Sequence, residues 1–592
     1  MILRTNKSGW IWRALVYAGM ALILIPKLPV IRKLFALSLW PDMTFYLNVG
    51  FQPGFVLPVT GSVLTQIGGI PVIGIILVLL SMAVLTLVTR KLSGDGVHSM
   101  LPAVFVFLFI TGFDYSLYTF RSQGLLFSQT LGLLFSALIV WGWTAVADRK
   151  WNFLYPLAAV LAGYPLIGAY AVLAAVGIFL LCVSEKRWVS AFTALACAGL
   201  IPLFYTHLVF THIDTAYTFV AGLPYMDFVD NHKRFLPLGL AALSLIVLPL
   251  FKGRLRSGWP GLVTSVLAAA VLVACFLLFS FRDRNFHIEL AMWHAVERND
   301  WDKVLSLAVK SDKPTRVIVM YRNIALMYKG QLCDRMFTFP NETIDIDTPA
   351  QISQTEVCGM TVFFHNGLIN YSARWAWEMS MMFQRTLERY KYLAKVALFT
   401  GKENPALVEK YLDIIDENMY QRGWVKKYRS YLNNPESLNS DPEYKMFTAL
   451  DRFEEIKYMS SAVVENTILN HYLLQENPEG VMLDQSLAAA MTAKDTDMFW
   501  YFYDILLRSG RPVPRHVGEA AILFAYLDRN QAEIDSVARD LGGPNSPTVS
   551  RFVRFSSEAS AFTPGGDTSS FKKRYGDTYW YYAYFVKSLT TN

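Results

Sequence analysis

The sequence predicts an all-α fold in two parts: a polytopic transmembrane helical domain over residues 1–281 and a soluble helical-repeat domain over residues 282–592. Three observations predict it. The 592 residues are 53% hydrophobic and 17% charged, which is typical of a protein partly dissolved in lipid. The first half holds apolar stretches of about 20 residues, the length that crosses a bilayer. The second half alternates apolar i, i+3, i+4 spacing with short polar turns, which indicates paired helices.

Apolar stretches in the first half are predicted to be single membrane spans. The first begins near Arg4, Lys7 and Arg13 and is not followed by an Ala-x-Ala-like cleavage site, so we expect a retained signal-anchor. The predicted spans are Trp10–Ile25, Ile70–Thr89, Leu101–Tyr118, Leu125–Ala147, Val189–Leu208, Phe235–Phe251 and Leu262–Phe281.

The remaining apolar segment, Phe153–Cys182, has two interpretations with opposite topologies. It is too long for one untilted span, and Gly163-Tyr164-Pro165 interrupts it. If it reverses there as a hairpin, the chain makes nine crossings and the C-terminal half lies in the periplasm of a bacterial inner membrane. If it is one span, the chain makes eight and that half lies in the cytoplasm. The positive-inside rule favours the hairpin, which places twelve Lys/Arg inside and eight outside.

Charge differs between the halves. Residues 1–281 hold 18 Lys/Arg against 8 Asp/Glu, and residues 282–592 hold 36 against 39. The basic excess therefore belongs to the membrane half, where cationic loops orient spans. The soluble half lacks the positive face that nucleic acid requires, so we expect no nucleic-acid partner.

The cysteines indicate no metal site. Cys182, Cys197 and Cys275 lie in apolar spans, and neither Cys333 nor Cys358 has a CxxC or Cys/His neighbour. Whether Cys333 and Cys358 form a disulfide stays open, because the sequence does not fix their distance. No cofactor is identified, and no motif supports a divalent metal.

Polar residues near the predicted outer face are the candidate site residues. Asp42 is the first carboxylate and stands in a polar loop, Pro41–Gly69, between two spans. It is either a reactive group or the N-cap of a short helix, because Pro-Asp precedes MTFYL.

Asp114 follows a predicted span, and Arg121 lies seven residues on, where a helix would bring both onto roughly one face. They bind substrate or form a structural pair at the helix end. Lys233 and Arg234 lie in a later loop on the same predicted side.

The order of these features resembles the GT-C class of membrane glycosyltransferases over about residues 10–210. An acid-bearing loop follows the first span, a later span ends in an aromatic-rich turn with Arg121, and a basic loop precedes the segment with GYP. The resemblance implies sugar transfer from a polyprenyl-phosphate-linked donor outside the membrane, with Asp42 as the catalytic acid and Asp114 and Arg121 near the donor phosphate. Many members carry an acidic pair where this chain has Asp42 alone.

A second resemblance covers the whole chain. The runs YRNIALMYKGQLCDRMF, HNGLINYSARWAWEMSMM and KRYGDTYWYYAYF are similar to an uncharacterised family of bacterial multi-pass proteins whose C-terminal half is a helical repeat. This resemblance implies an architecture and a bacterial inner membrane, and no activity.

The second half is predicted to be a tetratricopeptide-like (TPR-like) solenoid. Polar turns recur at Asn299-Asp300-Trp301, Gly401-Lys402-Glu403, Lys494–Asp497 and Arg529-Asn530-Gln531, between amphipathic segments. The alternative is an ordinary helical bundle. The aromatic run Tyr579–Phe585 predicts a packed terminal helix.

Two functions fit this sequence. In the first, Asp42 of a GT-C-like transferase acts as general base or orients the acceptor hydroxyl. Arg121, together with Lys233 and Arg234, neutralises the phosphate of a polyprenyl-linked sugar donor. In the second, the protein is a non-catalytic scaffold. Its spans contact membrane lipid and serve only as an anchor, and its repeat domain binds a protein partner.

Overall fold

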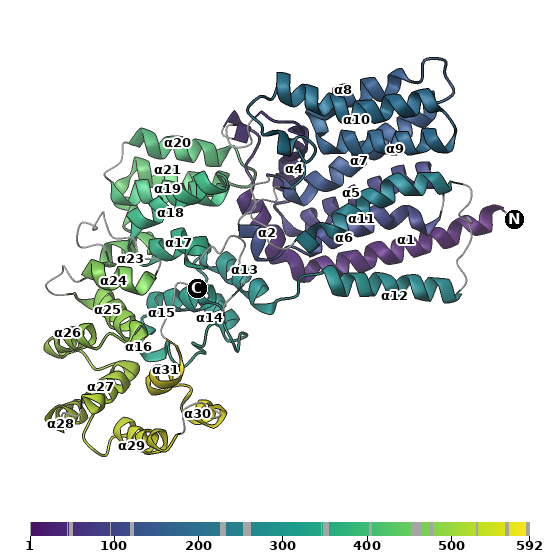
Figure 1. The fold of residues 1–592 in the computed structure, drawn as a ribbon. Helices are drawn as coiled ribbons and strands as arrows, with labels where there is room; N and C mark the ends of the chain where they lie inside the picture. Colours follow the sequence, from purple (N-terminus) through teal and green to yellow (C-terminus); the bar gives the residue numbers. More distant parts are fainter. Residues whose placement is uncertain are drawn as a thin grey trace. The chain divides into compact units, whose positions relative to one another are not determined.

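The computed structural model is all-helical in the residues that it describes (Figure 1). These are residues 2–587 except 44, 47–50, 95, 119–122, 225–231, 253–261, 345, 347–353, 402–404, 451–462, 473–477, 529–530 and 563–567. The chain forms two compact units. Unit 1 comprises Met1–Arg282 with two segments of the second half, Met379–Tyr390 and Leu412–Lys426, which we call the first and the second inserted segment. Unit 2 comprises Asp283–Glu378, Lys391–Tyr411 and Lys427–Asn592.

Unit 1 is built mainly from apolar helices that run side by side. They are α1 (Ile2–Leu24), α2 (Leu28–Leu37), α4 (Val56–Ile67), α5 (Pro71–Ser93), α6 (Leu101–Thr111), α7 (Leu125–Val146), α8 (Leu154–Ile167), α9 (Ala169–Ser184), α10 (Trp188–Leu208), α11 (Leu236–Val247) and α12 (Leu262–Phe279). The 3-10 turns η3 (Tyr115–Tyr118) and η5 (His232–Phe235) precede α7 and α11. In the described part of the chain, four helical segments are long and apolar enough to cross a membrane: Arg13–Leu37, Pro71–Ser93, Leu125–Val146 and Trp188–Leu208.

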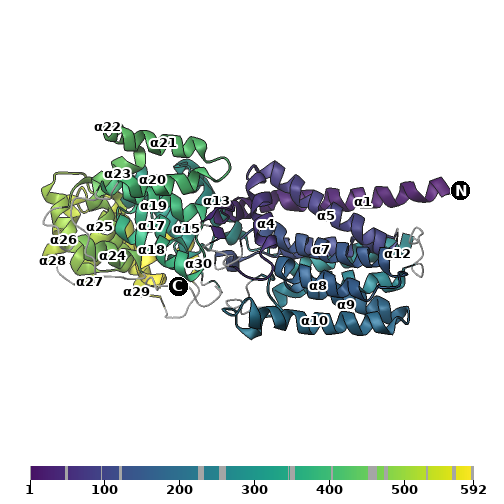
Figure 2. The same ribbon diagram turned by 90° about the horizontal axis from the view of Figure 1, so that it is seen from above.

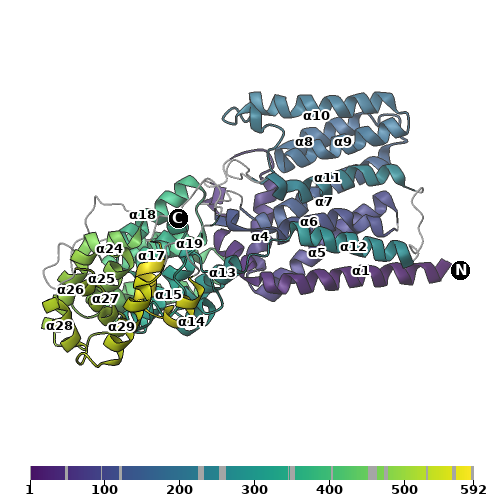
Figure 3. The same cartoon turned by 60° about the horizontal axis from the view of Figure 1, so that its bottom comes forward.

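The helices of unit 1 are ordered around α7. It packs against α4, α5 and α9, and α9 packs against α8 and α10. Figures 1 and 3 show α8, α9 and α10 along one edge of this unit, with α1 and α12 along the opposite edge. The N-terminus of α1 lies at one end, and α2 and α4 lie at the other. We call this second end the polar end, because the hydrogen-bonded side chains described below gather there.

Glycine lets the chain approach itself closely at the polar end. An added Cβ on Gly61 of α4 would lie 2.5 Å from the carbonyl oxygen of Gly124, just before α7. Gly124 itself has φ +63, a left-handed conformation that favours glycine. The middle of α4 and the residue before α7 therefore pack backbone against backbone here.

The segment Phe153–Cys182 forms a helical hairpin, but its predicted turn is misplaced. The chain reverses at Gly168, which has φ +57, and Pro165 lies inside α8. The two helices that flank Gly168 pack against each other. Gly168 is the better turn residue because a left-handed φ favours glycine, whereas Pro165 is accommodated near the end of α8.

We predicted a helix that would carry Asp114 and Arg121 on one face. This prediction is wrong for Asp114, which is not in a helix. Helix α6 ends at Thr111, and Asp114 lies in irregular backbone before η3. Arg121 lies outside the described residues.

The described part of the second half consists mainly of short helices, several of them joined by tight turns (Figure 2). They are α13 (Arg284–Val296), α14 (Trp301–Ala308), α15 (Arg316–Tyr328), α16 (Leu332–Arg335), α17 (Gln354–His365), α18 (Ile369–Met382), α19 (Leu387–Thr400), α20 (Pro405–Asp416), α21 (Arg422–Asn433), α22 (Pro435–Leu438), α23 (Pro442–Leu450), α24 (Val464–Tyr472), α25 (Gly480–Ala493), α26 (Thr496–Arg508), α27 (Arg515–Leu527), α28 (Gln531–Asp540), α29 (Pro547–Ser560), α30 (Ser569–Tyr575) and α31 (Tyr579–Phe585).

Several predicted polar turns begin and end these helices. Asp300 caps α14 by accepting from the Lys303 N–H at 3.1 Å, and Asp495 caps α26 by accepting from the Met498 N–H at 3.0 Å. Lys494 ends α25 in the left-handed conformation. Successive helices then pack in pairs, among them α13 with α14, α25 with α26 and α27 with α28.

Two further expectations concern buried side chains of the second half. The terminal aromatic run forms α31, with Tyr579 and Trp580 fully buried, as predicted. The open question of a disulfide is answered, because neither Cys333 nor Cys358 forms one, and both are buried. The Cys333 thiol donates to the Asp484 carbonyl oxygen at 3.2 Å.

Candidate functional site

A buried ion pair joins the two halves of the chain at the polar end. Lys33 on α2 places its Nζ 2.5 Å from Oε2 of Glu388, and both side chains are less than a tenth exposed. The same ammonium lies 5.9 Å from the ring centroid of Tyr118 on η3. Lys33 falls within a segment apolar enough to cross a membrane, where an unpaired charge would be costly. Glu388 therefore neutralises a cation that the first half buries.

Gln123 holds the segment around Glu388 in place. Its Oε1 accepts from the Leu39 N–H at 3.1 Å, and its Nε2 donates to Gln384 Oε1 at 3.1 Å and to the Arg385 carbonyl oxygen at 3.2 Å. Gln123 and Gln384 are both buried. This one amide joins the loop after α2, the start of α7 and the first inserted segment.

The second inserted segment is held through Asn418 and Gln66. Asn418 Oδ1 accepts from the Trp40 N–H at 2.7 Å and from Gln66 Nε2 at 3.3 Å. Gln66 is fully buried, and its Oε1 accepts from the Met419 N–H at 3.2 Å. Buried amides of this kind are tied to one arrangement, because losing a partner leaves a desolvated polar atom.

Asp42 lies in the same region and caps a helical turn. Its Oδ1 accepts from the Phe45 N–H at 2.8 Å, and its side chain is half-buried. It is also within electrostatic reach of Tyr390 from the first inserted segment. Burial raises the pKa of Tyr390, Arg385 lowers it, partly through a hydrogen bond, and the Asp42 carboxylate raises it. A carboxylate from the first half and a guanidinium from the second half therefore both act on this phenol.

Asp114 is paired with Arg234. Arg234 donates from Nη1 to Oδ1 at 2.6 Å, and its Nη2 lies 2.5 Å from Oδ2. Asp114 also accepts from the N–H and the hydroxyl of Ser116, at 2.9 and 2.6 Å. Burial raises the pKa of Asp114, and the Arg234 guanidinium opposes that rise. The bidentate geometry fixes η5 against the residues that follow α6.

The structure thus brings together two of the five predicted site residues. Asp114 and Arg234 bind each other, and in the described residues neither shares a hydrogen bond or ion pair with Asp42. Lys233 lies in η5, and its side chain is outside the described part, as is all of Arg121. The Arg234 guanidinium is occupied by a carboxylate, so it is not a free cation for a phosphate.

Four residues of this region were not identified from the sequence: Lys33, Arg385, Glu388 and Tyr390. Lys33 could have been identified from the sequence, because a cation beside an apolar run needs a partner of opposite charge. The other three lie about 350 residues further on, and nothing near them in the sequence indicates that they reach the first half.

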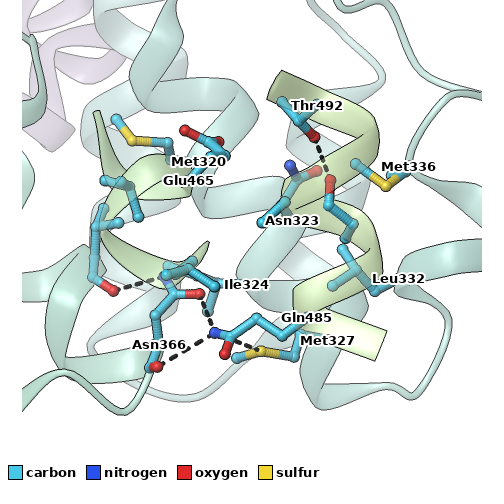
Figure 4. A pocket seen from close by; sticks show the side chains of 15 residues that line it. Met320, Asn323, Ile324, Met327, Leu332, Met336, Asn366, Glu465, Gln485 and Thr492 are labelled. Atoms are coloured by element: carbon cyan, nitrogen blue, oxygen red, sulfur yellow. Dashed lines mark hydrogen bonds between the residues drawn. The ribbon is translucent and has the colours of Figure 1, made fainter. Parts of the chain in front are cut away.

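The described cavities are small. In unit 1, one of about 10 Å³ lies beside Ser38, Thr65 and Gln384, with room for about one water. In unit 2, one of about 40 Å³ is lined by residues that include Asn366, Glu465 and Gln485 (Figure 4). There Gln485 Nε2 donates to Asn366 Oδ1 at 2.7 Å. The described part of the chain holds no group of three or more His, Cys, Asp or Glu that could bind a metal ion.

One family of known sequences matches nearly the whole chain. The model of a family of unknown function (DUF6057) matches residues 33–586. No curated protein and no solved structure matches the chain. The match confirms the predicted resemblance to an uncharacterised family. The matched residues include Lys33 and Glu388 and both inserted segments.

Proposed function

Because the chain belongs to DUF6057, a family of unknown function, its activity has to be argued from its own residues, and we propose a membrane glycosyltransferase of GT-C type. The observation that carries the proposal is that Asp42 and Arg385 both act on the Tyr390 phenol at the polar end of unit 1, where Gln123 bonds the backbone of Leu39 and of Arg385. The acid comes from the loop after α2, and the cation and the phenol come from the second half. A carboxylate that accepts a proton and a cation that stabilises a leaving phosphate are groups that serve the transfer of a sugar from a lipid-linked phosphate.

The proposed topology has nine crossings, by α1 and α5 to α12 in order, in a bacterial inner membrane. Four long apolar segments and the shorter apolar helices α6, α8, α9 and α11 support it. The pairs Arg90/Lys91, Arg149/Lys150 and Lys186/Arg187 then share the cytoplasmic side with the N-terminus. The polar end and the C-terminal half lie on the periplasmic side.

In the proposed reaction Asp42 removes the proton from an acceptor hydroxyl. The hydroxyl oxygen forms a bond to the anomeric carbon of the donor sugar, and the bond from that carbon to the phosphate oxygen breaks. The polyprenyl phosphate leaves with the negative charge, which Arg385 stabilises, with Arg121 and Lys233 as further cations. We assign Arg234 to holding Asp114 in place, since its guanidinium is already paired.

The test is the material that purifies with the full chain. Extraction of the purified protein and mass spectrometry of the lipids should detect a polyprenyl phosphate or its sugar conjugate. An Arg385→Ala variant should retain less of it, and Arg374→Ala is the matched control, because Arg374 pairs with Glu378 on the exposed surface of α18. Equal or absent retention of polyprenyl lipid in all three proteins would contradict the proposal.

A non-catalytic scaffold is the second candidate, favoured by the packing of the second half. Successive short amphipathic helices there pack in pairs, as in a TPR-like solenoid, which offers a surface to a protein partner. A scaffold should co-purify with a protein and retain no polyprenyl lipid.

A further inference from the structure

We propose that the tips of both inserted segments lie in the lipid headgroup layer, where a rim of exposed apolar side chains contacts the bilayer. The rim comprises Met43, Met381, Met382, Met419 and Tyr420, with exposed fractions of 73, 76, 48, 36 and 53%. Single exposed apolar side chains are ordinary. Five of them at one end of a unit that also carries membrane-length apolar helices mark an interface.

Tyr420 fixes the level of the rim relative to a membrane-length helix. Its hydroxyl donates to the Ile67 carbonyl oxygen at 3.0 Å, and its ring centroid lies 6.4 Å from that of Phe35. Pro71, four residues after Ile67, begins α5, and Val72 on that helix is 66% exposed. Tyr420 thus stands beside the first residues of a segment apolar enough to cross a membrane. Tyrosine is enriched at this depth, because its ring is apolar and its hydroxyl is polar.

The backbone of the second tip is held in an unusual conformation. Tyr420 has φ +64, a left-handed value that is uncommon for a residue with a side chain. It is retained because Asn418 is bonded to Trp40 and Gln66 on one side, and the Tyr420 hydroxyl is bonded on the other. The exposed ring is therefore placed by a rigid loop.

The first tip repeats this arrangement. Met381 and Met382 end α18, directly before Phe383 and the anchored Gln384. Arg389 Nη1 closes the same loop by donating to the Met379 carbonyl oxygen at 2.9 Å. In both tips an amide bonded to the first half stands within three residues of an exposed apolar pair. Because both inserted segments hold exposed apolar side chains in this way, we infer that both contact the same apolar surface. The apolar surface next to the start of α5 is the bilayer.

Photo-crosslinking of the full chain in nanodiscs of a single phospholipid tests this. A benzophenone amino acid replaces Met419, Met381, Leu200 or Val553 in turn. Leu200 on α10 is 66% exposed and serves as the lipid-facing control, and Val553 in unit 2 is 59% exposed and serves as the solvent control. After irradiation, intact mass should show one phospholipid adduct at 419, 381 and 200 and none at 553.

The outcomes separate the occupants. Lipid adducts at 200 with none at 419 and 381 would overturn the proposal. Adducts of 419 or 381 with a second protein chain would overturn it as well, because the rim would then be a protein interface. Adducts at 553 equal to those at 419 would show contact without specificity and would also refute it.

Discussion

Lys33 and Glu388 stand 355 positions apart in the sequence, and their side chains form a buried ion pair with 2.5 Å between Nζ and Oε2. Together with Gln123 and Asn418, they make the polar end of unit 1 from both halves of the chain. The first 281 residues alone would therefore leave the Lys33 ammonium without its carboxylate.

Breaking this pair on one side should destabilise the protein more than removing both charges. We expect Lys33→Met or Glu388→Leu to cost about 3–5 kcal/mol, because each removes one partner of a buried ion pair and leaves the opposite charge in the interior. The double variant should recover most of that loss. The midpoint of thermal unfolding, followed by a thiol-reactive dye on the buried cysteines, measures it. If the double variant is as unstable as the sum of the single ones, the buried pair does not act as described.

Acid should weaken unit 2 through His365. Its Nδ1 lies 3.0 Å from the Tyr328 hydroxyl, its ring is buried, and burial lowers its pKa from 6.5 to about 4. The unfolded chain therefore binds a proton at His365 more readily than the folded protein does. Above pH 6.5 the ring is neutral in both states and the free energy of unfolding keeps its full value; as the pH falls from 6.5 towards 4, protonation of the unfolded chain lowers it. The loss is on the order of 3 kcal/mol.

The thermal midpoint at several pH values between 7.5 and 4.5 checks this. His365→Gln should flatten the decline, whereas the exposed His212→Gln should leave it unchanged. Parallel declines for all three proteins would show that His365 does not set the pH response.

The terminal helix α31 should depend on the charge of Glu519. This buried carboxylate accepts from Arg515 Nε at 3.0 Å and from the Tyr579 N–H at 2.8 Å, and its Oε2 lies 2.8 Å from His516 Nδ1. Glu519→Gln keeps the shape but weakens charge-assisted hydrogen bonds, at about 1–3 kcal/mol. Hydrogen exchange of residues 579–585 should accelerate at least several-fold, and Glu436→Gln on the exposed surface should not change it. Unchanged protection in Glu519→Gln would rule out this role.

Features of neighbouring residues predicted the helices, but they did not predict the pairings between residues far apart in the sequence. Apolar length predicted α5, α7 and α10, and Asp300 and Asp495 marked helix starts, because capping depends on neighbours in sequence. The turn at Gly168 was misplaced, since both Pro165 and Gly168 are candidate breakers and only the observed φ distinguishes them. Nothing local links Asp114 to Arg234, 120 positions on, because an ion pair leaves no periodic trace in the sequence.

Turnover by an Asp42→Asn variant is the most direct test of the proposed transferase. Asparagine caps a helix as well as aspartate does, so the hydrogen bond from the Phe45 N–H and the fold should survive. Only the proton acceptor is lost. The matched control is Asp214→Asn, because Asp214 is an exposed cap that accepts from the Ala216 N–H at 2.9 Å.

The measurement compares the glycans and glycolipids of bacteria that carry the wild-type chain, each variant or no chain, at equal protein abundance. We predict that one product disappears with Asp42→Asn and with the deletion, falling at least 100-fold, and that it persists with Asp214→Asn. A product that persists unchanged with Asp42→Asn, at normal abundance of a folded protein, would contradict the account.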